Sequence, residues 1–362
     1  KSYVYIIMSN NPNSENSQKD NLEETQSFSE IEEEQKEIIE KDFIPHFLPT
    51  YRIKFKFYPV PIVVVIILAA ILAYLTFVVA GVQIEESYFP EDELGALAVI
   101  LNGVLFTVIA VVSGFVIVFF IKKLGIGVLK YLFGLSFGLV GFFITMMFLE
   151  IIIYLIFIQF PETTFVFKLY FLIINLYLPV GTAVSVFFLI YKYFTSKSIK
   201  TKNFIVLYIS LLISSSMSIV LPFWSTLAIL IGISFWDIFA VLYKKGPIKE
   251  MIEILSENDN EDEVTKAEIK EKIEDGIAIY DTSKLEIGIG DLVFYGLLAS
   301  SVLLETNNVI ITALTTIAIV IGTGITISRL KKNKVLPGLP ISIFLGIGAF
   351  LLSQLIVFIF FT

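Results

Sequence analysis

The sequence contains no cysteine and a single histidine, His46, which lies outside the long apolar stretches. Without cysteine the chain cannot form disulfides, bind a metal through thiolates or use a cysteine nucleophile. The place of the lone histidine argues against a Ser-His-Asp triad, and its being alone excludes a zinc motif such as H-E-x-x-H. If this chain hydrolyses a substrate, carboxylates must carry the reaction, and we expect no metal and no cofactor.

Basic residues are also few, and none of them forms the kind of patch that binds nucleic acid. The chain has 26 Lys and Arg against 34 Asp and Glu, for a net charge of −8. Acidic residues gather in the N-terminal tail and after Lys245, whereas basic residues stand beside the apolar stretches. Nucleic-acid binding would require basic patches with exposed aromatic side chains, so we expect no nucleic-acid partner.

Apolar residues dominate the rest of the chain. They make up 56% of the sequence, and the mean hydropathy is +0.84. They form blocks of roughly 20 residues, the length that a helix needs to cross about 30 Å of hydrocarbon. The blocks lack the alternation of a membrane barrel. We therefore predict an all-α polytopic membrane protein with nine transmembrane helices, near residues 59–82, 95–121, 128–158, 165–191, 203–220, 223–243, 287–305, 309–329 and 338–361.

The fifth and sixth predicted helices are divided within a run of about 40 residues that has no charge until Asp237 and is too long for one span. Ser214–Ser216, Pro222 and Trp224 offer a turn there, near a membrane interface. Four regions follow: a polar, acidic and largely disordered tail (1–50), spans one to six (51–243), a cytoplasmic loop with a membrane-surface helix and a possible strand (244–285), and spans seven to nine (286–362). Within these regions, aromatic and basic residues at 44–57 suit a segment at the membrane surface.

The charged loops predict the orientation of the chain. Lysine and arginine follow the second, fourth, sixth and eighth predicted spans and precede the first, whereas the other connections are acidic or neutral, Lys168 apart. Basic loops stay on the cytoplasmic side of a membrane. With nine spans, this places the N-terminus in the cytoplasm and the C-terminus outside.

Two aspartates, Asp237 and Asp291, lie within predicted spans. Placing a charged side chain in the bilayer costs at least a few kcal/mol, so each aspartate indicates a specific structural or functional role. At 1.5 Å per residue, Asp237 is roughly 10 Å from Lys244 at the end of its span, and Asp291 is roughly 8 Å from Glu286 at the start of its own. Two carboxylates close together in a low dielectric share a proton, and one can activate water while the other polarises a carbonyl. Pairing with a buried donor or lining an ion pathway are the alternatives.

Three short motifs accompany these aspartates. Asp291 ends Gly288-Ile289-Gly290-Asp291, Asp237 follows Trp236, and Pro337-Gly338-Leu339-Pro340 begins the last predicted span. The two glycines remove side chains beside Asp291, which lets another helix or a substrate backbone approach. The prolines favour non-helical backbone, whose polar groups are then available near the site. Ordinary packing of small residues is the alternative explanation.

These motifs, in this order, resemble the presenilin and signal-peptide-peptidase family of intramembrane proteases. That family has a Tyr-Asp pair, a G-x-G-D motif and a Pro-Ala-Leu motif, and the likeness covers about residues 223–362. The resemblance implies that Asp237 and Asp291 are catalytic, with support from Trp236, Gly288, Gly290, Pro337, Gly338, Leu339 and Pro340. The chain departs from the family at Trp236, where the family has Tyr, and at Gly338, where it has Ala.

The resemblance further implies an aspartic endopeptidase whose substrates are single transmembrane helices in the lipid bilayer. Ile277–Leu285 is rich in β-branched and aromatic residues and is predicted to pair with an unwound substrate as an added strand. The expected contacts are Ile277, Ile279, Tyr280 and Leu285. A prepilin-peptidase-like protease and an ion channel or transporter are the alternatives, and the sequence predicts neither accessory subunits nor an oligomeric state.

Two further features lie in the third span. Glu150 is predicted to be a buried, protonated acid that is bonded to a neighbouring residue, with a functional role as the alternative. Gly134, Gly138 and Gly141 recur at helical spacing and predict a face on which another helix packs closely.

Overall fold

The protein is described by a computed structural model over residues 37–39, 49–82, 88–125, 127–161, 163–196, 198–243, 278–280, 284–330 and 337–361. The predicted surface helix near residue 250 and most of the predicted N-terminal tail lie outside these residues. The chain divides into two units. In the smaller unit, β1 (Glu37–Ile39) pairs in parallel with β3 (Ala278–Tyr280), Ile38 opposite Ile279.

The larger unit is a bundle of apolar helices. Within the described residues, nine helices are long and apolar enough to cross a membrane, which confirms the predicted all-α, multi-pass membrane protein. The first span comprises η1 (Phe55–Phe57), α2 (Pro59–Tyr74) and η2 (Leu75–Val79), and the fourth comprises α6 (Thr164–Leu172), η3 (Ile173–Tyr177) and α7 (Leu178–Thr195). The other spans are α4 (Ala96–Leu124), α5 (Gly127–Phe157), α8 (Ile199–Val220), α9 (Phe223–Leu242), α12 (Ile289–Thr306), α13 (Val309–Leu330) and α14 (Leu339–Phe361), and a short α3 (Glu91–Leu94) precedes α4.

The predicted division between the fifth and sixth spans is confirmed, but only Pro222 makes it. Helix α8 ends at Val220, and α9 begins at Phe223 because proline cannot continue the hydrogen-bond ladder of the preceding helix. The serines that were expected to form a turn lie inside α8 instead. Ser214 donates a hydrogen bond to the carbonyl of Val293 at 2.9 Å, and Ser215 donates one to that of Ala69 at 3.2 Å. These bonds fasten α8 to its neighbours α12 and α2.

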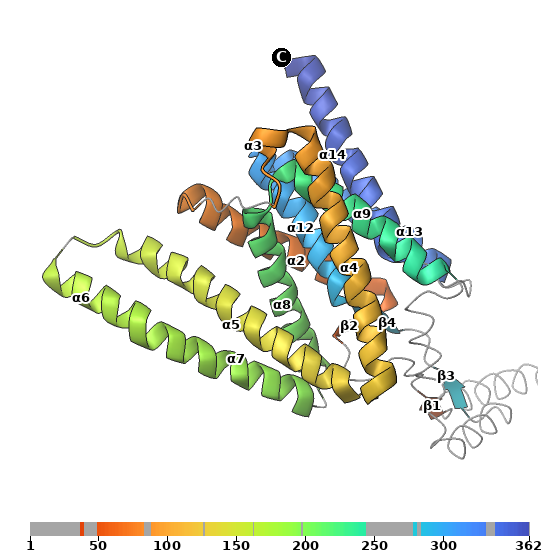
Figure 1. Ribbon diagram of the computed structural model, residues 1–362, viewed down its shortest axis with the longest axis horizontal. Coiled ribbons are helices and arrows are strands. Elements are labelled where there is room, and N and C mark those ends of the chain that lie inside the picture. The colour runs from red at the N-terminus through yellow and green to blue at the C-terminus, as the bar shows by residue number, and fades with distance from the viewer. Residues whose placement is uncertain are drawn as a thin grey trace, which may run out of the picture. The chain divides into compact units, whose positions relative to one another are not determined.

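Helix α12 has the largest buried share among the candidate spans and packs against α2, α8, α9, α13 and α14 (Figure 1). Small residues allow this close packing: a Cβ added at Gly296 would lie 2.8 Å from the Cβ of Ser214. Large apolar side chains such as Leu297, Leu298 and Val302 are fully buried on the same helix. The helix that carries Asp291 is therefore held from several sides.

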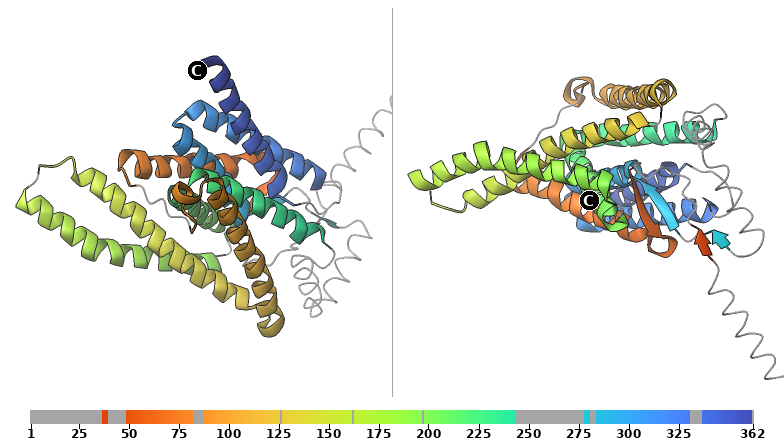
Figure 2. Two further views of the ribbon diagram at one scale, coloured as in Figure 1. Left: turned by 45° about the horizontal axis from the view of Figure 1, so that its top comes forward. Right: turned by 90° about the horizontal axis from the view of Figure 1, so that it is seen from below.

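Helix α5 and the α6–α7 span form a long antiparallel hairpin, yellow to green in Figures 1 and 2. The three glycines of α5 face α7, as predicted. Added Cβ atoms at Gly134, Gly138 and Gly141 would lie 3.1, 3.2 and 3.4 Å from side chains of α7, those of Phe194, Ile190 and Val186. The outer face of the hairpin is apolar and exposed, which suits lipid.

The prediction that Glu150 is buried is wrong. Glu150 is exposed on α5, whereas Phe148 is 3% exposed and packs into an apolar cluster with Leu212 and Ile219. Two residues turn a helix by about 200°, so a helix that buries Phe148 directs Glu150 outward. Hydropathy predicts where a residue lies along a span, but not which face of the helix it occupies.

Helices α13 and α14 meet at a glycine. A Cβ added at Gly322 would lie 2.6 Å from the Cα of Ser342 and 3.0 Å from the carbonyl oxygen of Ile341, which are backbone atoms that cannot rotate away. We expect Gly322→Ala to destabilise the fold by about 1–3 kcal/mol through overpacking. Thermal unfolding in detergent measures this effect. Gly348→Ala on α14, where a Cβ meets nothing within 4 Å, is the matched control. Equal melting temperatures of the two variants would contradict the close contact between Gly322 and Ser342.

A small antiparallel sheet precedes the first and seventh spans. Strand β2 (Thr50–Lys54) pairs with β4 (Lys284–Gly288), with Arg52 opposite Glu286. The sequence predicts a surface segment at 44–57 and does not predict β2. Strand β4 continues without a loop into α12, so this sheet determines where the first turn of α12 lies.

Candidate active site

Asp237 lies on α9, five residues before the helix ends at Leu242, and is partly buried. Its Oδ2 accepts a hydrogen bond from the backbone N–H of Leu339 at 3.2 Å, and the N–H of Gly338 also faces this carboxylate. Helix α9 supplies the carboxylate, and the start of α14 supplies the donors. The Trp236-Asp237 motif and the Pro337–Pro340 motif therefore meet in space.

Asp291 lies in the first turn of α12, where an acidic residue suits the exposed N–H groups of a helix start. Gly288 ends strand β4 and has extended backbone angles of φ −64° and ψ 145°. A Cβ added at Gly288 would lie 3.7 Å from Asp291 Oδ2, and one at Gly290 would meet only Phe294, at 3.9 Å. The two glycines thus leave space beside Asp291 that no described helix fills.

The segment Pro337–Pro340 lies against both aspartates. A Cβ added at Gly338 would be 3.0 Å from Oδ2 and 3.4 Å from Oδ1 of Asp291. The next residue, Leu339, donates to Asp237. Pro337, Leu339 and Pro340 are buried, so packing as well as hydrogen bonding holds this backbone. Three motifs that are far apart in the sequence converge on one place, where two consecutive residues, Gly338 and Leu339, contact Asp291 and Asp237 respectively.

A residue that the sequence motifs do not include holds the Gly338 backbone. The hydroxyl of Tyr295, which is 1% exposed, lies 3.3 Å from the carbonyl of Gly338 and 3.2 Å from Ser342 Oγ. Ser342 in turn bonds Thr323 at 3.0 Å. Tyr295 is four residues after Asp291 on α12, and residues at that spacing share one helix face. This spacing was the available signal in the sequence.

Trp236 packs away from the carboxylates, toward α4. Its ring stacks on Phe239, with centroids 5.6 Å apart and planes at 29°, and lies 6.0 Å from Phe115. A Cβ added at Gly114 of α4 would lie 3.2 Å from the indole. The contact is apolar, so exchanging Tyr for Trp here keeps an aromatic surface against α4.

The four predicted substrate contacts do not belong to one unit of the described chain. Ile277 lies outside them, Ile279 and Tyr280 belong to β3 in the smaller unit, and Leu285 belongs to β4, opposite Ile53. Leu285 packs partly into the apolar core of the bundle. Across the described ranges, no three His, Cys, Asp or Glu side chains are grouped so that they can hold a metal ion.

Comparison with known proteins gives concordant results. Presenilin-B of Dictyostelium discoideum is 36% identical over 140 residues, which are 37% of this chain and 26% of that protein. A presenilin-like protein of Arabidopsis thaliana is 31% identical over 96 residues, which are 26% of this chain and 24% of that protein. The chain spans about a quarter of the length of the curated relatives that it matches.

The fold also has a counterpart among solved structures. The structure of a presenilin family intramembrane aspartate protease superposes with a TM-score of 0.51 and 13% identity, covering 82% of this chain and 95% of that one. The model of the family described as Presenilin matches residues 56–265 and 256–361. Since these two ranges cover far more than half of the sequence, the chain belongs to the presenilin family.

Proposed function

We propose that this chain is an intramembrane aspartyl endopeptidase with Asp237 and Asp291 as its catalytic pair. One observation carries the proposal: the Gly338–Leu339 backbone touches both carboxylates, donating to Asp237 and lying against Asp291. Among the described residues neither acid pairs with a basic side chain, and such an arrangement suits proton transfer better than a structural ion pair does. Family membership supports the same reading.

Asp237 and Asp291 share one proton, because two ionised carboxylates that lie close together repel each other in a low dielectric. The ionised carboxylate takes a proton from a water molecule, and the water oxygen attacks the scissile carbonyl. The protonated partner donates a hydrogen bond to the developing oxyanion and then supplies the proton for the leaving amine. Backbone donors at Gly338 and Leu339 keep one carboxylate oriented, so the reorganisation during the reaction is small.

A helical substrate hides its amides in internal hydrogen bonds, so it must unwind before attack. Strand β4 offers such a segment a place to bind. The backbone N–H and C=O of Arg52 point away from β4, toward Asn203, so Arg52 and Glu286 form a non-hydrogen-bonded pair of the antiparallel sheet. In such a sheet the N–H groups of Glu286 and Gly288 then point to the edge of β4 that faces away from β2. Among the described strands β4 pairs with β2 alone, which leaves that edge for a substrate strand close to Asp291.

Gly288→Pro tests this edge. The φ of −64° at Gly288 already suits proline, so the change removes the outward N–H with little backbone strain. One lost hydrogen bond of about 1 kcal/mol raises KM by about fivefold, with a smaller change in kcat. Steady-state kinetics on a single-span substrate measure both. Gly288→Ala retains the N–H and serves as the comparison: an equal rise of KM in both variants would argue against an added strand.

We further propose that the N-terminus and the active site face the cytoplasm and that the C-terminus lies outside. The basic residues beside the apolar helices support this orientation: Lys122 and Lys123 end α4, and Arg329 lies in the last turn of α13. The end of α9 and the starts of α12 and α14, which carry the site, then lie on the same side as these residues. Accessible substrates are single transmembrane helices whose N-termini lie outside.

The experiment is cleavage of a single-span protein by the purified chain in proteoliposomes. We expect two fragments, each ending within or beside the apolar stretch of the substrate. An ion-flux assay on the same vesicles addresses the alternative of a channel or transporter. Ion flux that depends on Asp237 and Asp291, without cleavage of any offered substrate, would favour that alternative.

A further inference from the structure

Strand β2, which precedes the first span, reaches the beginning of the helix that carries Asp291. The carbonyl of Pro49, just before β2, accepts a hydrogen bond from the N–H of Ile289 at 3.1 Å. Ile289 is the first residue of α12, and its N–H has no partner within its own helix. The pairing of β2 with β4 therefore continues into the first turn of α12, two residues before Asp291.

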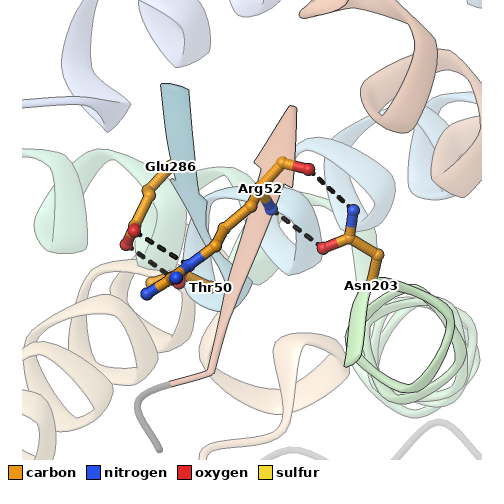
Figure 3. A network of polar contacts seen from close by, with 4 residues as sticks. All are labelled: Thr50, Arg52, Asn203 and Glu286. Carbon is orange, nitrogen blue, oxygen red and sulfur yellow. Dashed lines mark hydrogen bonds and ion pairs between the residues drawn. The ribbon is translucent and has the colours of Figure 1, made fainter. Parts of the chain in front are cut away.

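Side chains of β2 also hold Glu286 of β4 from the opposite strand (Figure 3). Arg52 Nε lies 2.9 Å from Glu286 Oε1, and Thr50 Oγ1 donates to Glu286 Oε2 at 3.0 Å. The side chains of Arg52 and Glu286 are only 13% and 21% exposed. Breaking a largely buried pair by changing one partner leaves a charge uncompensated, so the pair has a stronger effect on geometry than a surface ion pair.

The outer edge of β2 is held by Asn203 of α8, on the other side of Arg52 in Figure 3. The Asn203 side-chain oxygen accepts from the Arg52 N–H at 2.9 Å, and its NH₂ group donates to the Arg52 carbonyl at 2.7 Å. One carboxamide thus makes the two bonds that a neighbouring strand would make. A continuous set of contacts leads from α8 through β2 and β4 to Asp291.

From these contacts we infer that Thr50, Arg52 and Asn203 are positioning residues of the protease site, an inference that rests on the proposed function. They act through Glu286 and Ile289. Through Glu286 they fix the position of β4, which receives the substrate strand, and through Ile289 they fix the position of Asp291 at the start of α12. The segment before the first span is therefore part of the active-site framework. It is not only a membrane-surface anchor.

A charge exchange tests this inference. Arg52→Glu places two acids together and separates β2 from β4, and we expect kcat per folded molecule to fall roughly 100-fold, the effect of about 1 Å of misplacement. We also expect the cleavage position in the substrate to shift, because a displaced β4 presents a different bond to the aspartates. Arg52→Glu/Glu286→Arg restores the ion pair and recovers the original position and most of the rate.

Lys54→Gln removes a positive charge from the exposed end of the same strand and is the matched control. A role in stability alone lowers the yield of folded protein without moving the cleavage position, which mass spectrometry of the fragments reports. An unchanged position in Arg52→Glu, or no recovery in the double variant, would overturn the inference.

A second measurement does not depend on catalysis. The chain has no cysteine, so Lys54→Cys/Lys284→Cys creates a single pair at two residues that lie opposite each other in the sheet. We expect rapid disulfide formation on oxidation, slowed at least tenfold when Arg52→Glu is added. Equal rates overturn the inference even if the protein cuts its substrate. If the parent chain shows no cleavage that depends on Asp237 and Asp291, the proposed function is overturned instead. The rate of cross-linking then still decides whether Arg52 holds β4.

Discussion

Asp237→Asn and Asp291→Asn are each expected to remove detectable cleavage of a single-span substrate. Asparagine keeps the shape of the side chain but can neither accept nor deliver the proton that the reaction moves. General acid–base groups contribute about 10²–10⁴-fold to a rate, and the two acids act as one unit, so either loss should be nearly complete. Fragment quantification over a long incubation measures the residual rate.

Glu150→Gln is the matched control for these variants. Glu150 is also an acid within a candidate span, but it lies exposed on α5, outside the contacts of the carboxylate pair. We expect its removal to leave the cleavage rate unchanged. A loss of activity in Glu150→Gln as large as in the two Asn variants would mean that acids in the bilayer act in some other way, for example along an ion pathway.

Gly338→Val is expected to reduce kcat by about 100-fold, the order of loss that a misplacement of about 1 Å causes. The Cβ alone would lie 3.0 Å from Asp291 Oδ2, and the two methyl groups of valine need further space. Either Asp291 or the Pro337–Pro340 backbone must move, and that backbone also carries the donor to Asp237. Gly338→Ala requires a shift of only a few tenths of an ångström, so it should retain activity within about tenfold.

Gly348→Val on the same helix separates this effect from a general cost of valine in α14. A Cβ at Gly348 meets nothing within 4 Å, so activity and folded yield should remain near those of the parent. If Gly338→Val cuts as fast as Gly348→Val, the Gly338 backbone does not lie against Asp291 during catalysis.

The nine spans could be predicted because each apolar block is as long as the bilayer requires and the basic residues alternate consistently. The neighbourhood of Asp237 and Asp291 followed from their similar depths and from the motif at Pro337–Pro340. Depth and order along the chain are one-dimensional properties, which a sequence contains directly. Their catalytic roles remain predictions.

The rest depended on three-dimensional pairing. Strand β2 is short and mixes aromatic with basic residues, so nothing in its own sequence names β4 as its partner more than 200 residues away. Tyr295 resembles any aromatic residue of a membrane helix until Gly338 is placed beside it. Glu150 was assigned to the interior because a charge in a span usually faces protein, whereas the packing of Phe148 turns it outward.

Mass spectrometry of the fragments that the purified protein makes from a single-span substrate tests the central claim most directly. The carboxylates lie within about one to two helical turns of the end of α9 and the start of α12, the helix ends that we propose face the cytoplasm. We therefore predict new termini inside the apolar stretch of the substrate, near its cytoplasmic end, and none with Asp237→Asn or Asp291→Asn. Termini confined to the polar flanks, or the same fragments from either variant, would contradict an aspartate pair that cuts within the bilayer.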